Sequence, residues 1–239
     1  MTPTLKDFLL ANLSALLRGR FFVCKGHLPP AGHRGPDGFA GVGVATNADP
    51  ATDDAIIRIL RDTGIHRVRL DFTYGDDENH VARFLDALLA GGFNVMLHLV
   101  QPADAAQSMP SADAAQEWRH FVCATLERFG SRIGILEACS TVNRKRWAGY
   151  SLDGFLAAWQ IAHEETRKRD ITLAGPSVTD FEPVWNVGLL RLLRDRNLLP
   201  DIHTDNLFSE RCTEPERWDH KILGHMLAPL IRFNLIRKA

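Results

Sequence analysis

The sequence predicts an α/β fold of the (β/α) TIM-barrel type, incomplete at about six of the eight units of a full barrel. Short apolar runs typical of strands alternate with helical patterns six times after residue 40. Such units require parallel strands joined by right-handed crossovers. Each unit is about 33 residues long, an ordinary length for a strand and its helix. The alternative is an open doubly wound sheet, but no Gly-rich phosphate loop follows any predicted strand.

The first three units have the clearest patterns. The strand runs HRVRLDF and FNVMLHLV are apolar and rich in β-branched and aromatic residues. Ile56, Ile59 and Leu60 lie on one face of the first of these helices. The predicted strands and helices alternate at residues 41–45, 55–63, 66–72, 81–90, 93–100 and 113–129.

The last three units follow the same order with weaker signals. His203, Thr204 and Asp205 make the sixth strand polar, and Pro229 falls within the last predicted helix. The predicted strands and helices alternate at residues 132–137, 151–169, 171–175, 187–195, 201–207 and from about 219 to the end.

Residues 1–40 are predicted to lie outside the barrel domain, which we assign to residues 41–239. They contain an apolar stretch, residues 5–17, and a Gly/Pro-rich connector of irregular structure. Lys6, Asp7 and Asn12 make the apolar stretch too polar to span a bilayer, so we predict an amphipathic helix. A peripheral contact with a membrane is the alternative.

The composition is that of an ordinary globular protein, with 45% hydrophobic and 24% charged residues. The 28 basic and 29 acidic residues give no field that would favour nucleic acid. The four cysteines form no CxxC pair, which favours reduced thiols and a cytoplasmic location. The histidines show no metal-binding spacing, and we predict neither a metal nor a cofactor.

The stretch RIGILEACSTVNRKRWAGY, residues 132–150, is the best candidate site. It begins as a strand and breaks into polar residues, as at the carboxyl end of a strand where parallel-sheet enzymes place their chemistry. The other predicted strand ends also carry carboxylates, amides and tryptophans. Such groups suit a sugar, whose hydroxyls need paired hydrogen bonds and whose C–H faces stack on aromatic rings. The loop residues concerned are Asp71, Asn143, Trp147, Asp180, Trp185, Asp205 and Asn206. Packing beneath loops is the alternative role for the tryptophans.

Several positions resemble the clan of TIM-barrel retaining glycoside hydrolases that includes β-xylosidases and cellulases. Arg69 on the second strand and His98 on the third match residues of that clan, as does Gly175-Pro176-Ser177 after the fifth. Its Glu-x-Trp-Asn-Glu-Pro-Asn run corresponds to residues 137–143 here. The resemblance covers about residues 41–210 and implies a carbohydrate ligand contacted by Arg69 and His98.

The match fails at the catalytic positions of that clan. Ser140 and Thr141 replace its Asn-Glu pair, and a threonine hydroxyl cannot deliver a proton as a carboxylic acid does. The nucleophile of that clan lies at the end of the seventh strand, whereas only six strands are predicted here. If the protein is an enzyme, Glu137 and Asp205 are our candidate catalytic carboxylates. The alternative for Glu137 is a buried ion pair with Arg69, because both residues are predicted to point into the barrel.

Three functional hypotheses follow. The protein acts on a glycan with rearranged carboxylates, or it binds sugar without turnover, or it is a truncated product that needs a partner. The open edges of a six-stranded sheet favour a homo-oligomer in the third case.

Overall fold

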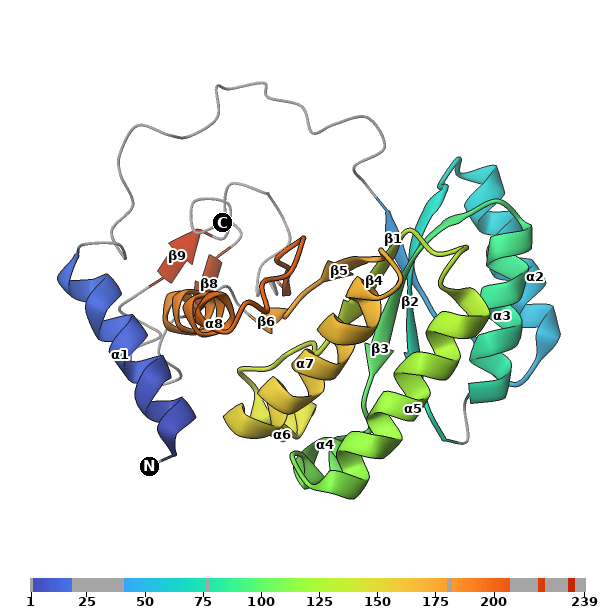
Figure 1. The fold of residues 1–239 in the computed structure, drawn as a ribbon. Helices are drawn as coiled ribbons and strands as arrows, with labels where there is room; N and C mark the ends of the chain where they lie inside the picture. The colour runs from blue at the N-terminus through green and yellow to red at the C-terminus, as the bar shows by residue number, and fades with distance from the viewer. Residues whose placement is uncertain are drawn as a thin grey trace.

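The computed structural model describes residues 2–18, 41–75, 78–179, 182–206, 219–221 and 232–234 (Figure 1). Its centre is a parallel sheet of five strands in the order β1-β2-β3-β4-β5, each beside its neighbour in the sequence. A doubly wound sheet reverses direction at a switch point, whereas a (β/α) barrel keeps the sequential order. The order therefore confirms the prediction of the (β/α) type.

The strands of this sheet begin and end close to the predicted positions. They are β1 (Val42–Val44), β2 (Arg67–Thr73), β3 (Asn94–Val100), β4 (Ile135–Ala138) and β5 (Thr172–Ala174). A sixth position continues the sheet, because β6 (Val178–Thr179) pairs in parallel with β7 (Asp205–Asn206). A parallel bridge between Ala174 and Ile202 joins β5 to the segment that precedes β7.

The helices include the six expected ones before residue 200 and two short ones that periodicity could not reveal. The longer helices are α1 (Pro3–Leu17), α2 (Pro50–Asp62), α3 (Glu78–Ala90), α5 (Ala112–Phe129), α7 (Leu152–Arg167) and α8 (Pro183–Asp195). The short ones are α4 (Ala103–Ser108) and α6 (Lys145–Ala148). Side chains of Thr2, Asp49, Ser111 and Ser151 cap α1, α2, α5 and α7 at their N-termini.

The helix predicted from residue 219 to the end is wrong where the structure describes that region. Asp219–Lys221 forms β8 and Arg232–Asn234 forms β9, and the two pair antiparallel. Gly224 and Pro229 lie between them in the sequence, and both residues disfavour a continuous helix.

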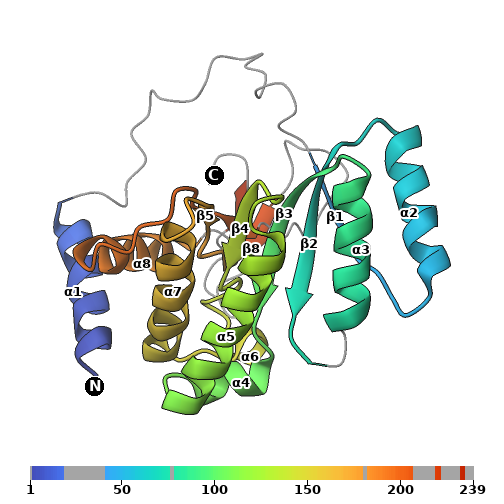
Figure 2. The same ribbon diagram turned by 45° about the vertical axis from the view of Figure 1, so that its right-hand side comes forward.

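The two faces of the sheet differ in chemistry. Helices α3, α5 and α7 cover one face (Figures 1 and 2). Leu70, Leu97, Leu136 and Leu173 lie in register across β2 to β5, and all four are buried on that face. One residue further along β2, β3 and β4, the register places polar side chains on the opposite face.

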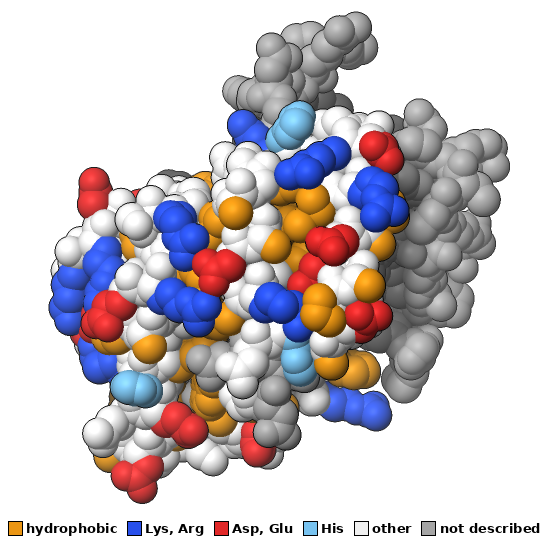
Figure 3. All heavy atoms as spheres, turned by 90° about the vertical axis from the view of Figure 1, so that its right-hand side faces the viewer, with side chains coloured by type: hydrophobic (Ala, Val, Ile, Leu, Met, Phe, Trp, Pro, Cys, Tyr) orange, Lys and Arg blue, Asp and Glu red, His pale blue; other side chains and the backbone are white. Residues whose placement is uncertain are grey.

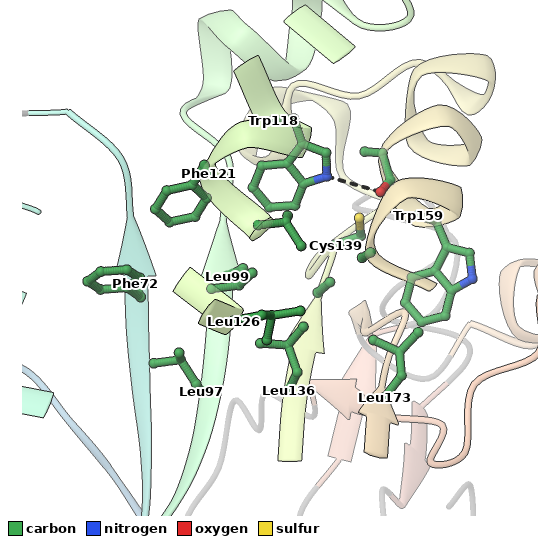
Figure 4. Packing of buried hydrophobic residues seen from close by; sticks show 14 of the residues in the cluster. Phe72, Leu97, Leu99, Trp118, Phe121, Leu126, Leu136, Cys139, Trp159 and Leu173 are labelled. Atoms are coloured by element: carbon green, nitrogen blue, oxygen red, sulfur yellow. Dashed lines mark hydrogen bonds between the residues drawn. The ribbon is translucent and has the colours of Figure 1, made fainter. Parts of the chain in front are cut away.

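The covered face carries the main hydrophobic core. Phe72 stacks on Phe121 of α5 with ring centroids 5.4 Å apart. Trp118 and Trp159 are fully buried, and Nε1 of Trp118 donates to the Ala158 carbonyl at 3.0 Å, which links α5 to α7 (Figure 4). Because buried Trp N–H groups need partners, this bond fixes how the two helices pack.

Helix α1 packs against α8, far from it in the sequence. Phe8 of α1 contacts Trp185 of α8 with ring centroids 5.1 Å apart. Gly188 lies beneath Phe8 and Asn12, where any Cβ would collide with both side chains. The leucines of α1 are exposed, and among the described helices none is long and apolar enough to cross a membrane. The connector at residues 19–40 lies outside the described part of the chain.

Figure 3 views the molecule from the side of α2 and α3. Basic and acidic side chains alternate on this face, with hydrophobic side chains between them. This mixture agrees with the near-zero net charge of −1.

Candidate functional site

Arg69 is the centre of a polar cluster on the face of the sheet opposite the helices. Its Nε donates to Oε2 of Glu137 at 2.6 Å, and its Nη1 donates to Oδ1 of Asp71 at 2.7 Å. Its Nη2 lies 2.6 Å from Nδ1 of His98. The strand register brings these residues together, because Asp71 pairs with His98 and His98 with Glu137. The structure therefore joins four candidates that lie on three different strands.

Glu137 forms the buried ion pair that we gave as the alternative to catalysis. Its side chain is 3% exposed. Arg69 occupies one carboxylate oxygen, and Thr204 donates its hydroxyl to the other at 2.8 Å. A carboxylate held in this way is well suited to fix strand positions.

Asp71 and His98 form the part of the cluster that borders open space. The Asp71 side chain is 60% exposed, whereas His98 is 3% exposed. Asp71 accepts from Nη1 of Arg69 at 2.7 Å, and an ion pair with a guanidinium favours the ionised form of a carboxyl group. Asp71 is therefore a carboxylate at neutral pH. Nε2 of His98 is buried and has no hydrogen-bond partner among the described residues.

The loop after β4 holds an unusual backbone conformation. Cys139 and Thr141 have φ angles of 58° and 59°, in the left-handed region that non-glycine residues seldom adopt. Asn206 holds the loop, since its amide donates to the hydroxyls of Ser140 at 3.1 Å and Thr141 at 3.3 Å. Strained conformations of this kind cluster at functional sites.

A cavity of about 200 Å³ lies between this loop, the ends of β2 and β3, and α6. Its polar lining consists of Asp71, His98, Gln101, Ser140, Thr141 and Tyr150. Trp147 of α6 also lines it and is 72% exposed, with the Arg146 guanidinium 5.7 Å from its ring. The cavity thus combines polar groups with one flat aromatic surface open to solvent.

The wall of the cavity between β3 and α6 is a chain of neutral groups. Tyr150 donates to Gln101 at 3.0 Å, and Gln101 donates to Tyr74 at 3.2 Å. Burial raises the pKa of the Cys139 thiol to about 12 and raises that of Tyr150 well above its usual value. Both groups therefore stay protonated at neutral pH, and neither serves as a nucleophile there.

Three of the predicted site residues lie elsewhere, and a fourth, Asp180, is not described. The amide of Asn143 pairs with the backbone of Thr179, accepting at 2.8 Å and donating at 2.9 Å. Trp185 packs on Phe8, as described above. Asp205 accepts from Asn186 of α8 at 3.1 Å.

Asp205 on β7 and Glu137 on β4 have different surroundings. Side chains alternate along a strand, so Thr204 and Asn206 point to Glu137 and the β4 loop while Asp205 points to α8. The same alternation explains why Thr204 and Asn206 belong to the site. Among the candidate residues, the structure gathers Arg69, Asp71, His98, Glu137, Trp147 and Asn206.

No group of His, Cys, Asp and Glu suited to a metal occurs in the described part of the chain. The polar cluster instead consists of one cation, two carboxylates and an imidazole bonded to one another.

No protein-family model matches the chain, and no curated protein matches it. Among solved structures, it is similar to D-psicose 3-epimerase from Clostridium cellulolyticum H10, determined with D-tagatose. The similarity has a TM-score of 0.40 and 10% sequence identity, and it covers 70% of this chain. The chain spans 63% of the length of that epimerase chain. Values this low assign neither a family nor an activity.

Proposed function

We propose that the cavity beside Trp147 binds a carbohydrate and that the protein does not hydrolyse it by the retaining mechanism. The observation that supports this proposal is the pairing of an exposed indole ring with a polar cavity. A sugar stacks its C–H face on an aromatic ring while its hydroxyls bond to carboxylate, hydroxyl and amide groups.

The size and charge of the cavity suit one neutral sugar ring. Its volume of about 200 Å³ is below the ~300–1,000 Å³ of sites for drug-sized ligands. The Asp71 carboxylate is exposed beside it and can accept hydrogen bonds from two hydroxyls. Its negative charge disfavours a phosphate or uronate at this position.

Within the described part of the chain, no carboxylic acid takes the place of the clan's general acid at this cavity. Thr141 lines the wall where the glycosidase clan has its general acid, and Glu137 is bonded to Arg69 and Thr204. A retaining pair requires two carboxyl groups about 5–5.5 Å apart, and Asp205 is directed to α8. The hypothesis of an enzyme differs from this proposal in a testable way. It predicts turnover that Glu137→Gln and Asp205→Asn each abolish.

The test is binding of neutral monosaccharides and short oligosaccharides to the full chain, measured by thermal unfolding and calorimetry. We expect one sugar to raise the melting temperature and Trp147→Ala to weaken its affinity about tenfold, as loss of an aromatic stacking partner does. Ile59→Ala is the matched control, because Ile59 is exposed on α2. A panel in which no sugar shifts unfolding, or equal affinity in Trp147→Ala, would contradict the proposal. Hydrolysis of a glycoside by the wild type with net retention of the anomeric configuration would contradict its second part.

A further inference from the structure

Nδ1 of His98 has two neighbours with opposite requirements. Nη2 of Arg69 lies 2.6 Å from it, and Oδ1 of Asp71 lies 2.9 Å from it. Arg69 can only donate a hydrogen bond, whereas a carboxylate can only accept one. In the neutral imidazole one ring nitrogen carries the proton and the other accepts, so Nδ1 satisfies one neighbour and not both.

The contacts favour Arg69 as the partner. An arginine side chain keeps its proton at any ordinary pH, and a proton on Nδ1 would face the N–H groups of Nη2 at the shorter of the two distances. Oδ1 of Asp71 does not need the imidazole, because it already accepts from Nη1 of Arg69 at 2.7 Å. Nδ1 therefore accepts from Arg69, and the single ring proton resides on Nε2.

We infer that Arg69 is a positioning residue that holds His98 as the Nε2–H tautomer, so that the cavity meets an N–H donor. Nε2 is buried without a partner among the described residues, and His98 lines the cavity. A buried donor left unsatisfied is unfavourable, so a ligand oxygen that bonds to it gains affinity. This inference rests on the proposed carbohydrate site. It favours a ligand that places a hydroxyl, ring or carbonyl oxygen beside Nε2 of His98, where that oxygen accepts a hydrogen bond.

The tautomer can be measured without any ligand. Long-range 1H–15N spectra of the full chain labelled with 15N-histidine separate the two neutral tautomers from each other and from the imidazolium. The spectrum of His98→Gln identifies the His98 signals by their absence. We expect the Nε2–H pattern at neutral pH. An Nδ1–H pattern, or two protonated ring nitrogens, would overturn the inference.

Variants of the two neighbours test which one sets the tautomer. Arg69→Met removes the donor, and we expect the proton to move to Nδ1 and bond to Asp71. Arg69→Met also leaves the Glu137 carboxylate buried without a cation. The double variant Arg69→Met/Glu137→Leu removes this unpaired charge, and its His98 tautomer is measured in the same way. Asp71→Asn is the control and should keep the Nε2–H pattern. An unchanged tautomer in both Arg69 variants would show that Arg69 does not position the ring.

Two substitutions of His98 connect the tautomer to binding. Glutamine can place an amide N–H near the position of Nε2, whereas asparagine reaches only the position of Nδ1. For the sugar found in the panel above, we expect His98→Asn to lose about tenfold in affinity or more and His98→Gln to stay within about threefold. Equal affinities of the two variants would contradict the donor role. If no sugar binds while the wild type shows the Nε2–H pattern, the carbohydrate proposal fails and the tautomer assignment stands.

Discussion

Nε of Arg69 on β2 lies 2.6 Å from Oε2 of Glu137 on β4, so this ion pair crosses the intervening strand β3. The pair lies on the face of the sheet that the helices do not cover. Since Glu137 also accepts from Thr204 at 2.8 Å, three non-neighbouring segments meet at one carboxylate. The cluster thus ties the middle of the sheet to the segment that carries β7.

Breaking this pair should destabilise the fold more than removing both partners. We expect Arg69→Met to lower the free energy of unfolding by about 3 kcal/mol, because it leaves the buried Glu137 unpaired. Arg69→Met/Glu137→Leu should cost less than the sum of the two single changes. Urea unfolding of the four proteins measures the coupling. Strict additivity would show that the two side chains do not stabilise each other.

Gly188 should be required for the contact between α1 and α8. A methyl group there would collide with Phe8 and Asn12, so we expect Gly188→Ala to cost about 1–2 kcal/mol of overpacking despite the better helix propensity of alanine. Gly43→Ala on β1 is the matched control, because a Cβ at Gly43 meets open space. Hydrogen exchange should show faster exchange in α1 of Gly188→Ala. Equal stability of the two variants would contradict this prediction.

The left-handed conformation of Thr141 should penalise branched side chains. Asparagine tolerates this conformation and retains a polar group, whereas valine keeps the branch and lacks the hydroxyl that contacts Asn206. We expect Thr141→Asn to be more stable than Thr141→Val by about 1–2 kcal/mol. Thermal and urea unfolding of both variants measure the difference. Identical midpoints would show that the loop relaxes without cost.

Glu165 should make the protein sensitive to acid. Burial alone would raise its pKa, but hydrogen bonds from Lys168, Arg169, Cys123 and Arg119 outweigh that effect and lower the pKa to about 2. Because the folded pKa lies below the ordinary value of 4.5, the unfolded chain binds more protons between the two values. The stabilisation is therefore complete above about pH 5 and is lost as the pH falls to about 2.

The loss attributable to Glu165 should reach about 2–3 kcal/mol over that range. Unfolding free energies at about pH 5 and pH 3, compared between wild type and Glu165→Gln, isolate this contribution from the other carboxylates. The variant should lose less stability between the two pH values. Parallel pH profiles would exclude Glu165 as a source of the acid sensitivity.

Strand alternation made the centre of the cluster predictable. Arg69 and Glu137 have inward positions on their strands, and their predicted pairing is confirmed at 2.6 Å. The repeated strand–helix pattern likewise predicted the parallel strands, and the choice of a barrel over a doubly wound sheet predicted their sequential order. Both are local properties of the sequence, combined with the geometry of parallel sheets.

Longer-range contacts were not predictable in the same way. The pattern around His203 to Asn206 is too polar to show which side of a two-residue strand faces the sheet, so it did not reveal that Asp205 points to α8. Trp185 lies in the first turn of α8, which begins at Pro183, four residues before the predicted start. Its packing on Phe8 depends on where α1 docks, and no local pattern specifies that position.

The docking of α1 has a consequence for synthesis on the ribosome. The side chains that hold α1 in place include Arg191 and Arg196, which bond to Ser14 and Asp7. At ~5–20 residues per second, α1 is synthesised about 9–35 s before those partners are made. During that interval Phe8, which is buried in the folded protein, has no α8 to cover it. A nascent chain of this protein therefore leaves Phe8 of α1 accessible to chaperones until α8 has been synthesised.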